Sequence, residues 1–302
     1  MRLGLPYKGS KSKIASRIFE LFPKTDNFYD LFCGGCSMAH YALLTKRFNK
    51  VIINDIDAGL PQLFIDAANG KYKNEKRWIS REDFYKLKDT EPYIKICWSF
   101  GNNGRNYLYS REIETWKKAL HYARVLNDFS LLKEIGIDTK DASKKWVKAN
   151  RDFIIKTYQN YIKETINDPE RLESLERLQR LERLQSLERL ERLEATSKDY
   201  SEIQIKKNSV IYCDIPYENT DEYGCSFDYE RFYKWCEKQT EPLFISSYSL
   251  PEDRFICIDK ISHRSILAAC KNSEVTEKVF IPKHQALKYY LPGSLFNFCD
   301  LY

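Results

Sequence analysis

The sequence of 302 residues lacks the features of a membrane-spanning or secreted protein. It contains no run of about 18 apolar residues, and no apolar signal-peptide core follows Met1. Its nine cysteines are an odd number scattered along the chain, unlike the paired cysteines of a disulfide framework. We therefore expect a cytoplasmic protein with reduced thiols that binds no membrane.

Also missing are a complete metal site and a complete phosphate loop. Cys33 and Cys36 have the spacing of a redox dithiol or of half a zinc site, but no second Cys-x-x-Cys and no histidine at ligand spacing accompanies them. In the segment from Gly4 to Ser12, one residue too many separates Gly9 from Ser12 for a phosphate loop. We therefore predict neither a bound metal nor a nucleoside triphosphatase.

What the chain does contain is typical of a globular protein. Hydrophobic residues make up 43% and aromatic residues 14%, which excludes a wholly disordered chain. Lys and Arg number 49 against 43 Asp and Glu, and the net charge of +6 is compatible with a polyanionic partner without proving one. The length allows about two domains or one large one.

Both ends of the chain alternate between strand and helix patterns. Strand 27–32, a tight turn at 33–36, helix 37–48 and strand 51–54 with Asp55 just beyond it form the strand, glycine turn, helix, strand and acid of a nucleotide-binding unit. Apolar strands are also predicted late in the chain, at 209–213, 243–247, 255–260 and 279–282. We therefore predict an α/β domain assembled from residues 1–57 and 203–302.

The middle of the chain, residues 58–202, is more charged and more helical, and we interpret it as an inserted domain. The predicted elements in it are a strand at 93–100, a hairpin turn at Asn103-Gly104, a returning strand at 107–109 and a helix at 112–126.

A low-complexity segment of Leu, Glu and Arg occupies residues 169–195 of the insertion. Its composition predicts a helix, but leucine at every third position drifts around a helix and makes no coiled-coil seam. We interpret it as a solvated connector helix, and a partner-binding helix is the alternative.

The segment Val210–Tyr217 is an apolar strand that ends in Asp214-Ile215-Pro216-Tyr217. A carboxylate, a rigid proline turn and an aromatic ring at the carboxyl end of a strand lie where α/β sheets bind ligands. The alternative is that Asp214 and Pro216 only form a turn.

Three motifs together resemble a known family. Asp214-Ile215-Pro216-Tyr217 resembles the Asp-Pro-Pro-Tyr motif of amino-group DNA methyltransferases, and Asp30–Ser37 resembles their Phe-x-Gly-x-Gly cofactor loop. With the box from Tyr7 to Lys11 ahead of them, their order resembles that of the Dam-type DNA adenine-N6 methyltransferases. The resemblance implies a class I methyltransferase, that is, a Rossmann-like sheet with helices on both faces, and an inserted, mostly helical DNA-recognition domain.

The resemblance also implies S-adenosylmethionine as cofactor and assigns residues to it. The residues implied in cofactor binding are Tyr7, Lys11, Asp30, Phe32, Gly34, Asp55 for the ribose, and Asp214. Two positions depart from the family pattern. Cys36 stands where the second loop glycine is usual and is a possible obstacle to the cofactor, and Ile215 stands where the first proline is usual.

The same resemblance implies a catalytic set of Asp214, Ile215, Pro216 and Tyr217. Asp214 and the carbonyl of Ile215 would accept the hydrogens of the adenine amino group, and Tyr217 would stack on a base flipped out of the duplex. No metal takes part in this transfer.

The turn around Asn103 resembles a DNA-reading hairpin. Asn102, Asn103, Arg105 and Tyr107 are the implied DNA-binding residues, because Asn and Arg make bidentate contacts with adenine and guanine in the major groove. An ordinary exposed hairpin is the alternative. The expected partner is double-stranded DNA in a bacterial or phage-infected cell, and the expected state is a monomer or weak dimer.

The interpretation is therefore site-specific adenine-N6 methylation of DNA, with two alternatives left open. Cytosine-N4 methylation needs the same acceptors, although Asp at the start of the motif favours adenine. A catalytically silent DNA-binding regulator would follow if Cys36 blocked the cofactor. A nicotinamide-dependent dehydrogenase is a more distant alternative, because it would not require the motif at Asp214.

Overall fold

The structure, a computed structural model, describes residues 3–7, 9–137, 190–216, 227–264 and 274–289. Its contacts divide the chain into two compact units. The first comprises Met1–Leu5, Gly9–Ile65 and Leu187–Tyr302, and the second comprises Pro6–Lys8 and Asp66–Ser186. Tyr217 and most of the low-complexity segment 169–195 lie outside the described residues.

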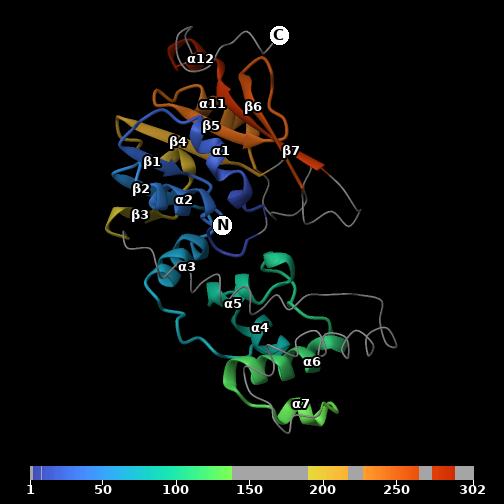
Figure 1. The fold of residues 1–302 in the computed structure, drawn as a ribbon. Helices are drawn as coiled ribbons and strands as arrows, with labels where there is room; N and C mark the ends of the chain where they lie inside the picture. Colours follow the sequence, from blue (N-terminus) through green and yellow to red (C-terminus); the bar gives the residue numbers. More distant parts are fainter. Residues whose placement is uncertain (1–2, 8, 138–189, 217–226, 265–273, 290–302) are drawn as a thin grey trace. The chain divides into compact units, whose positions relative to one another are not determined.

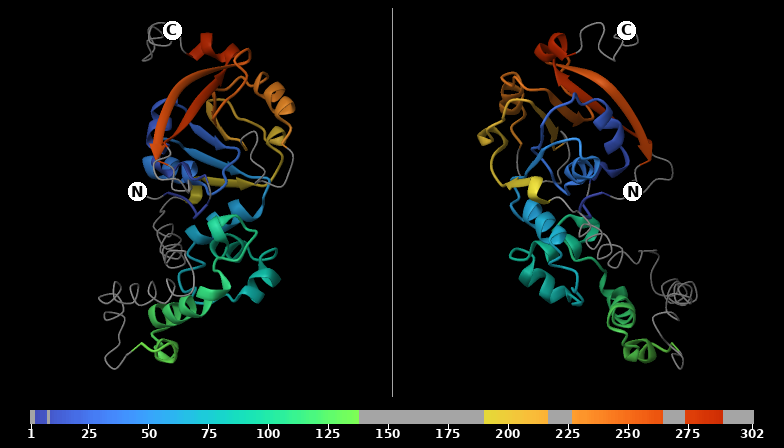
Figure 2. Two further views of the ribbon diagram at one scale, coloured as in Figure 1. Left: turned by 90° about the vertical axis from the view of Figure 1, so that its right-hand side faces the viewer. Right: turned by 60° about the vertical axis from the view of Figure 1, so that its left-hand side comes forward.

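A seven-stranded sheet forms the centre of the first unit (Figure 1). Its strands are β1 (Asn27–Asp30), β2 (Lys50–Asn54), β3 (Leu193–Thr196), β4 (Ser209–Asp214), β5 (Leu243–Ser247), β6 (Phe255–Arg264) and β7 (Glu274–Pro282). The order is β3-β2-β1-β4-β5-β7-β6, in which β1 to β5 are parallel and β7 is antiparallel to β5 and β6. Figure 2 shows the long β6–β7 pair from two further sides. The predicted Rossmann-like α/β class is confirmed.

The helices of this unit are α1 (Ala15–Glu20), α2 (Ser37–Thr45), α11 (Tyr229–Cys236) and α12 (Lys283–Tyr289), with 3-10 turns at Lys11–Lys13, Leu190–Arg192 and Tyr200–Glu202. Helix α3 (Gly59–Ala68) begins in this unit, and its residues from Asp66 onward belong to the second. Within the described residues no helix is long and apolar enough to cross a membrane.

One face of the sheet carries an aromatic layer. Phe28 of β1 and Phe244 of β5 project from this face, and the ring of Phe22, just after α1, lies 5.8 and 4.8 Å from theirs. Phe19 of α1 lies 5.3 Å from Phe28. Such aromatic pairs bury large areas, and they hold α1 against the sheet.

The opposite face packs against α11. Tyr29 of β1 and Ile245 of β5, each one residue further along its strand, form a buried cluster with Ile211 of β4 and with Phe232 and Cys236 of α11. Successive residues of a strand point to opposite faces of the sheet, and both faces are buried here. These strands therefore have continuous apolar sequences. The predicted helices on both faces are confirmed.

β3 corrects the end of the predicted helix 169–195, of which residues 169–189 lie outside the described residues. Leu190–Arg192 is a 3-10 turn, and Leu193–Thr196 pairs in parallel with β2, Val51 with Leu193 and Asn54 with Thr196. Helical composition is overridden here because pairing with β2 satisfies backbone groups that the edge of the sheet would otherwise expose. The α/β unit therefore resumes before residue 203, earlier than the predicted boundary.

The second unit is helical where it is described. Its helices are α4 (Arg81–Leu87), α5 (Pro92–Cys97), α6 (Arg111–His121) and α7 (Ser130–Glu134), with a 3-10 turn at Phe100–Asn102 and a π-helical turn at Tyr122–Leu126. The predicted helix 112–126 is confirmed.

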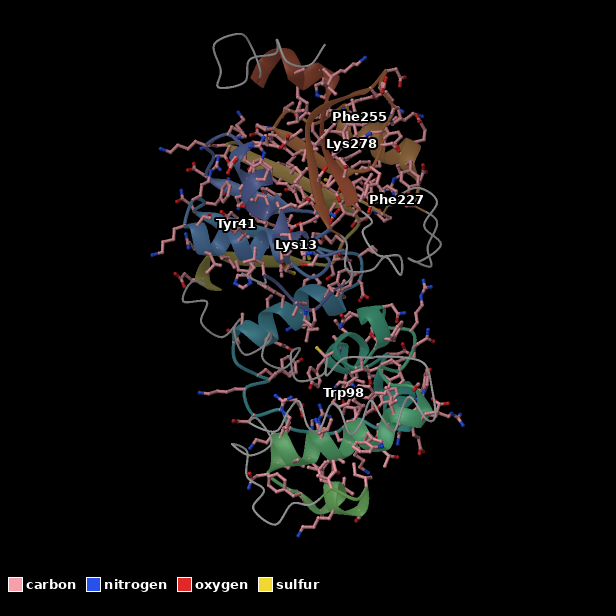
Figure 3. The ribbon with its side chains drawn as sticks, turned by 45° about the vertical axis from the view of Figure 1, so that its right-hand side comes forward. Lys13, Tyr41, Trp98, Phe227, Phe255 and Lys278 are labelled. Atoms are coloured by element: carbon pink, nitrogen blue, oxygen red, sulfur yellow. The ribbon has the colours of Figure 1, made fainter. Side chains whose placement is uncertain are left out.

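The predicted strand 93–100 is wrong, because residues 92–97 form α5. Pro92 occupies the first turn, where a missing N–H costs nothing, and Tyr93 is buried on the inner side. Trp98, labelled in Figure 3, lies in this core with its ring 5.3 Å from that of Trp78 and 5.9 Å from that of His121. In place of the predicted hairpin of strands 93–100 and 107–109, the structure has a single antiparallel bridge between Ser99 and Tyr107.

Candidate active site

The candidate site is built from the first unit alone. Tyr7, which is half-buried, groups with the second unit. Asp30, Asn54 and Asp214 end three neighbouring parallel strands, so all three lie at the carboxyl edge of the sheet. This edge is where ligands bind in open α/β sheets.

The loop between β1 and α2 is tied to the end of β2. The N–H of Cys33 donates to the carbonyl of Asn54 at 2.9 Å. The N–H of Gly34 donates to Asp55 Oδ2 at 2.9 Å, and Asp55 Oδ1 accepts from the N–H of Asp57 at 3.0 Å. Asp55 is therefore oriented by the glycine loop at the carboxyl end of β2.

Asn54 is a supporting residue that the sequence analysis missed. Its side-chain amide donates to the carbonyls of Leu31 and Lys198 at 3.1 and 3.0 Å, and its oxygen accepts from the N–H of Lys198 at 2.9 Å and from the hydroxyl of Thr196 at 2.8 Å. One buried amide thus links the ends of β1, β2 and β3. Partners 142 and 144 positions away leave no local signal in the sequence.

Cys36 explains why glycine is usual at its position. Its φ of +56° lies in the left-handed region, which costs a residue with a side chain about 1–2 kcal/mol. The side chain is fully buried, with its sulfur 3.4 Å from that of Cys33. The sulfur is therefore packed inside the loop and does not line its exposed surface.

Asp30 and Phe32 have mainly internal contacts. Cys36, the N-cap of α2, makes no side-chain cap bond, and the buried carboxylate of Asp30 instead accepts from the N–H of Ala39 at 3.2 Å. Burial, then Asp214 and Asp55, raise the pKa of Asp30 well above its usual value. The Phe32 ring lies 5.4 Å from that of Tyr200 within the core. Both residues support the loop from inside.

The N-terminal segment lies directly on the loop. The N–H of Leu5 donates to the carbonyl of Gly35 at 2.7 Å, and the N–H of Gly4 donates to Nδ1 of His40 at 2.9 Å. Gly4 has φ +67°, and a Cβ added there would lie 2.2 Å from the carbonyl oxygen of Gly35. This close approach requires glycine.

We expect Gly4→Ala to destabilise the protein by about 3 kcal/mol, because a left-handed backbone and a backbone clash add together. Gly136→Ala is the matched control, since Gly136 also has a positive φ, +83°, but nothing lies within 4 Å of its added Cβ. Thermal unfolding gives the loss of stability in each variant, and the difference between the two losses measures the clash at Gly4. Equal losses would contradict the close packing of Gly4 on the loop.

Lys11 and Asp214 meet as a buried ion pair. Lys11 Nζ lies 2.8 Å from Asp214 Oδ1 and 3.6 Å from Glu277 Oε2, a residue of β7 that the sequence analysis missed. Burial lowers the pKa of Lys11, but Asp214 and Glu277 more than offset it, so the pKa is raised and the ammonium stays charged. The backbone of Lys11 is held against the start of α2, because its N–H donates to Ser37 Oγ at 3.1 Å.

Asp214 keeps a 23% exposed side chain between these charges. Burial is the largest influence on its pKa and Glu277 acts in the same direction, whereas Lys11 lowers it; together they raise the pKa of Asp214 to about 6. The carboxylate is therefore mostly ionised at pH 7 and is a hydrogen-bond acceptor. The side chain of Ile215 is buried, and the carbonyl of Pro216 accepts from the hydroxyl of Tyr229 at 3.0 Å.

An exposed apolar side chain follows Asp55. Ile56 is 76% exposed at the carboxyl end of β2, next to a carboxylate that is half-buried. An acceptor for hydroxyls beside an apolar surface fits a ribose joined to a flat ring. The signal was present in the sequence as a large apolar residue between two acids.

The expected DNA-binding residues lie in the second unit and differ in exposure. Arg105 and Asn103 are exposed, and Asn103 Oδ1 accepts from the N–H of Arg105 at 2.8 Å, which shapes the turn. Asn102 donates to the carbonyl of Ile96 at 2.9 Å. Tyr107 is buried, and its hydroxyl donates to the carbonyl of Ile79 at 2.6 Å.

Comparison with known proteins gives one family. The model of the family described as D12 class N6 adenine-specific DNA methyltransferase matches residues 7–241. No curated protein matches the chain in sequence. Among solved structures, the chain is similar to the rRNA methyltransferase aviRa from Streptomyces viridochromogenes, with 12% identity and a TM-score of 0.38 over 92% of this chain and 86% of that one.

Proposed function

We propose that this chain, which belongs to the D12 class N6 adenine-specific DNA methyltransferase family, uses S-adenosylmethionine to methylate an adenine flipped out of duplex DNA. Family membership makes it an adenine-specific DNA methyltransferase, so cytosine-N4 methylation is not favoured. The order of its motifs supports the finer Dam-type assignment. The observation that carries the proposal is the ionised, partly exposed carboxylate of Asp214 at the same sheet edge as the glycine loop and Asp55.

The cofactor would bind at the ends of β1 and β2. Asp55 would accept hydrogen bonds from the ribose hydroxyls, and Ile56 would cover the adenine ring of the cofactor. Gly34 brings backbone close to the ligand, and Asp30 and Phe32 keep the loop in shape. When bound, S-adenosylmethionine supplies a methyl group on a positively charged sulfur. The buried sulfur of Cys36 gives no support to a silent homologue.

Asp214 would prepare the adenine amino group. The lone pair of that nitrogen is delocalised into the ring, so the amine is a weak nucleophile until acceptors hold its hydrogens in a tetrahedral arrangement. Asp214 would accept one hydrogen and the carbonyl of Ile215 the other, with Pro216 fixing the turn and Tyr217 stacking on the base. Positioning and electrostatics are then the main sources of rate enhancement.

The second unit would read the DNA sequence. Arg105 and Asn103 are exposed on the turn and have side chains that pair with guanine and adenine edges. Phe100 in the same turn is 50% exposed and is suited to contact bases. Asn102 and Tyr107 would act indirectly, because their side chains hold the turn.

The proposal is tested by incubating the protein with labelled S-adenosylmethionine and unmethylated duplex DNA. Sequencing that distinguishes N6-methyladenine from N4-methylcytosine then identifies the product. Methylated adenine in one short motif supports the proposal. A folded protein that binds DNA but transfers no methyl group would contradict it.

Arg105→Ala is expected to relax or abolish target choice at a cost of about 1–3 kcal/mol, because a bidentate contact to a base edge is lost. Arg111→Ala removes an exposed positive charge from the same unit and serves as the control. The measurement compares binding to target and non-target duplexes at one salt concentration. If Arg105→Ala weakens both equally, as a phosphate contact would, the turn does not read sequence.

A further inference from the structure

The ammonium group of Lys11 contacts Asp214, the carboxylate that we propose accepts a hydrogen of the adenine amino group. Its ammonium lies 2.8 Å from Asp214 Oδ1, the length of a charge-assisted hydrogen bond, whereas Glu277 Oε2 is 3.6 Å away. An adenine amino group that donates to Asp214 must compete with this ammonium for the carboxylate.

Lys11 cannot simply release Asp214. A buried cation without an anion is strongly unfavourable, and the Lys11 side chain is only 5% exposed. Glu277 is the other carboxylate within 4 Å of Nζ among the described residues, and it is buried on β7. The residue that follows it in the sequence, Lys278, is labelled in Figure 3. Closing the 3.6 Å contact to about 2.8 Å would form an equivalent bond to Glu277.

We propose that Glu277 is a positioning residue that takes over the ammonium of Lys11 when the adenine amino group reaches Asp214, a step that rests on the proposed role of Asp214. Total charge is conserved in this exchange, because one cation moves between two carboxylates. No proton is transferred and no covalent bond is made or broken. Asp214 becomes available to the base while Lys11 remains paired.

The other groups around Asp214 do not supply an anion for Lys11 in this way. The titratable side chains that also interact with Asp214 in the described parts of the chain are Asp30 of β1, Tyr212 and Cys213 of β4, and Tyr248 after β5. Burial is the largest cause that raises the pKa of each of them, which favours their neutral forms.

The test is the pH profile of kcat/KM for unmethylated duplex DNA with labelled S-adenosylmethionine. Because the ionised carboxylate of Asp214 is a much stronger acceptor than its protonated form and its pKa is about 6, the wild-type rate should fall as the pH drops through about 6. In Glu277→Gln the negative charge that raises this pKa is gone, so the acidic limb should move to lower pH. The plateau should fall about 10- to 100-fold, because Lys11 loses the carboxylate proposed to take it over from Asp214.

Glu241→Gln, in which the amide oxygen can still accept from the N–H of Ser209, should leave both the limb and the plateau unchanged. A Glu277→Gln protein with a lower rate but an unmoved limb, or with the wild-type rate, would overturn the proposal. If Glu277→Gln fails to unfold cooperatively, Glu277→Asp replaces it. This variant keeps the negative charge but moves it away from Lys11 by one methylene. A reduced plateau then supports the proposal, and a wild-type plateau overturns it.

Failure of this step is distinguishable from failure of the proposed function. If Asp214→Asn remains active, the role of Asp214 is wrong and the exchange has no purpose. If Asp214→Asn is inactive and Glu277→Gln keeps the wild-type profile, only the exchange is wrong.

Discussion

Asp214→Asn is expected to reduce methyl transfer by about a thousandfold or more, because the base loses the ionised acceptor that makes its nitrogen nucleophilic. The amide keeps the size of the side chain, so the β4 turn should be retained. DNA binding should stay within a few-fold of the wild type, since the reading residues are proposed to lie in the second unit. Single-turnover incorporation of labelled methyl and equilibrium DNA binding measure the two effects.

Asp259→Asn is the matched control for this change. Asp259 lies on β6 and pairs with Arg17 at 2.9 Å, away from the residues proposed to contact base or cofactor. It should keep the wild-type transfer rate. Equal losses of DNA binding and methyl transfer in Asp214→Asn would show that the carboxylate supports structure instead of chemistry.

Lys11→Met is expected to destabilise the protein by about 3–5 kcal/mol at pH 8, because removing one partner of a buried ion pair leaves unpaired charge behind. Asp214 and Glu277 would then face each other without the cation. Without Lys11, which lowers it, the pKa of Asp214 would rise further above its unfolded value, because the negative charge of Glu277 still raises it.

This loss should depend on pH with a definite sign. A carboxyl whose folded pKa is raised binds a proton more tightly in the folded state, so the stability of Lys11→Met should fall as the pH rises and recover towards pH 5. Urea unfolding at pH 5.5 and pH 8 measures the difference. Lys13→Met, which removes an exposed lysine from the same 3-10 turn, should show almost no loss at either pH. An equal loss for Lys11→Met at both pH values would exclude an electrostatic cause.

The strands that carry the site could be predicted because their signal is local. β1, β2, β4 and β5 are short apolar runs bounded by polar residues, and Asp30, Asp55 and Asp214 stand at or just beyond strand ends. Burial on both faces of a parallel sheet produces such runs directly. The structure brings Lys11 and Asp214 into contact, although 203 positions separate them in the sequence.

Other elements could not be predicted because distant residues decide them. β3 has a helical composition, but pairing with β2 makes it a strand. The apolar run at 93–100 has the composition of a strand, and Pro92 was the local indication of a helix start that we overlooked. Glu277 stands in an alternating strand pattern, and its place in the site depends on its contact with Lys11, which is 266 positions earlier in the chain.

The arrangement of the sheet has a consequence for how the protein forms during synthesis. Asn27 of β1 pairs with Lys50 nearby, but its other neighbour is Ser209 of β4, so the centre of the sheet joins segments that the ribosome makes far apart in time. Contacts of such long range slow folding, whereas the local helices of α4 to α7 form quickly. We expect the helices α4 to α7 to form on the nascent chain before the centre of the sheet, because β1 can pair with β4 only after residues 209–214 have been synthesised.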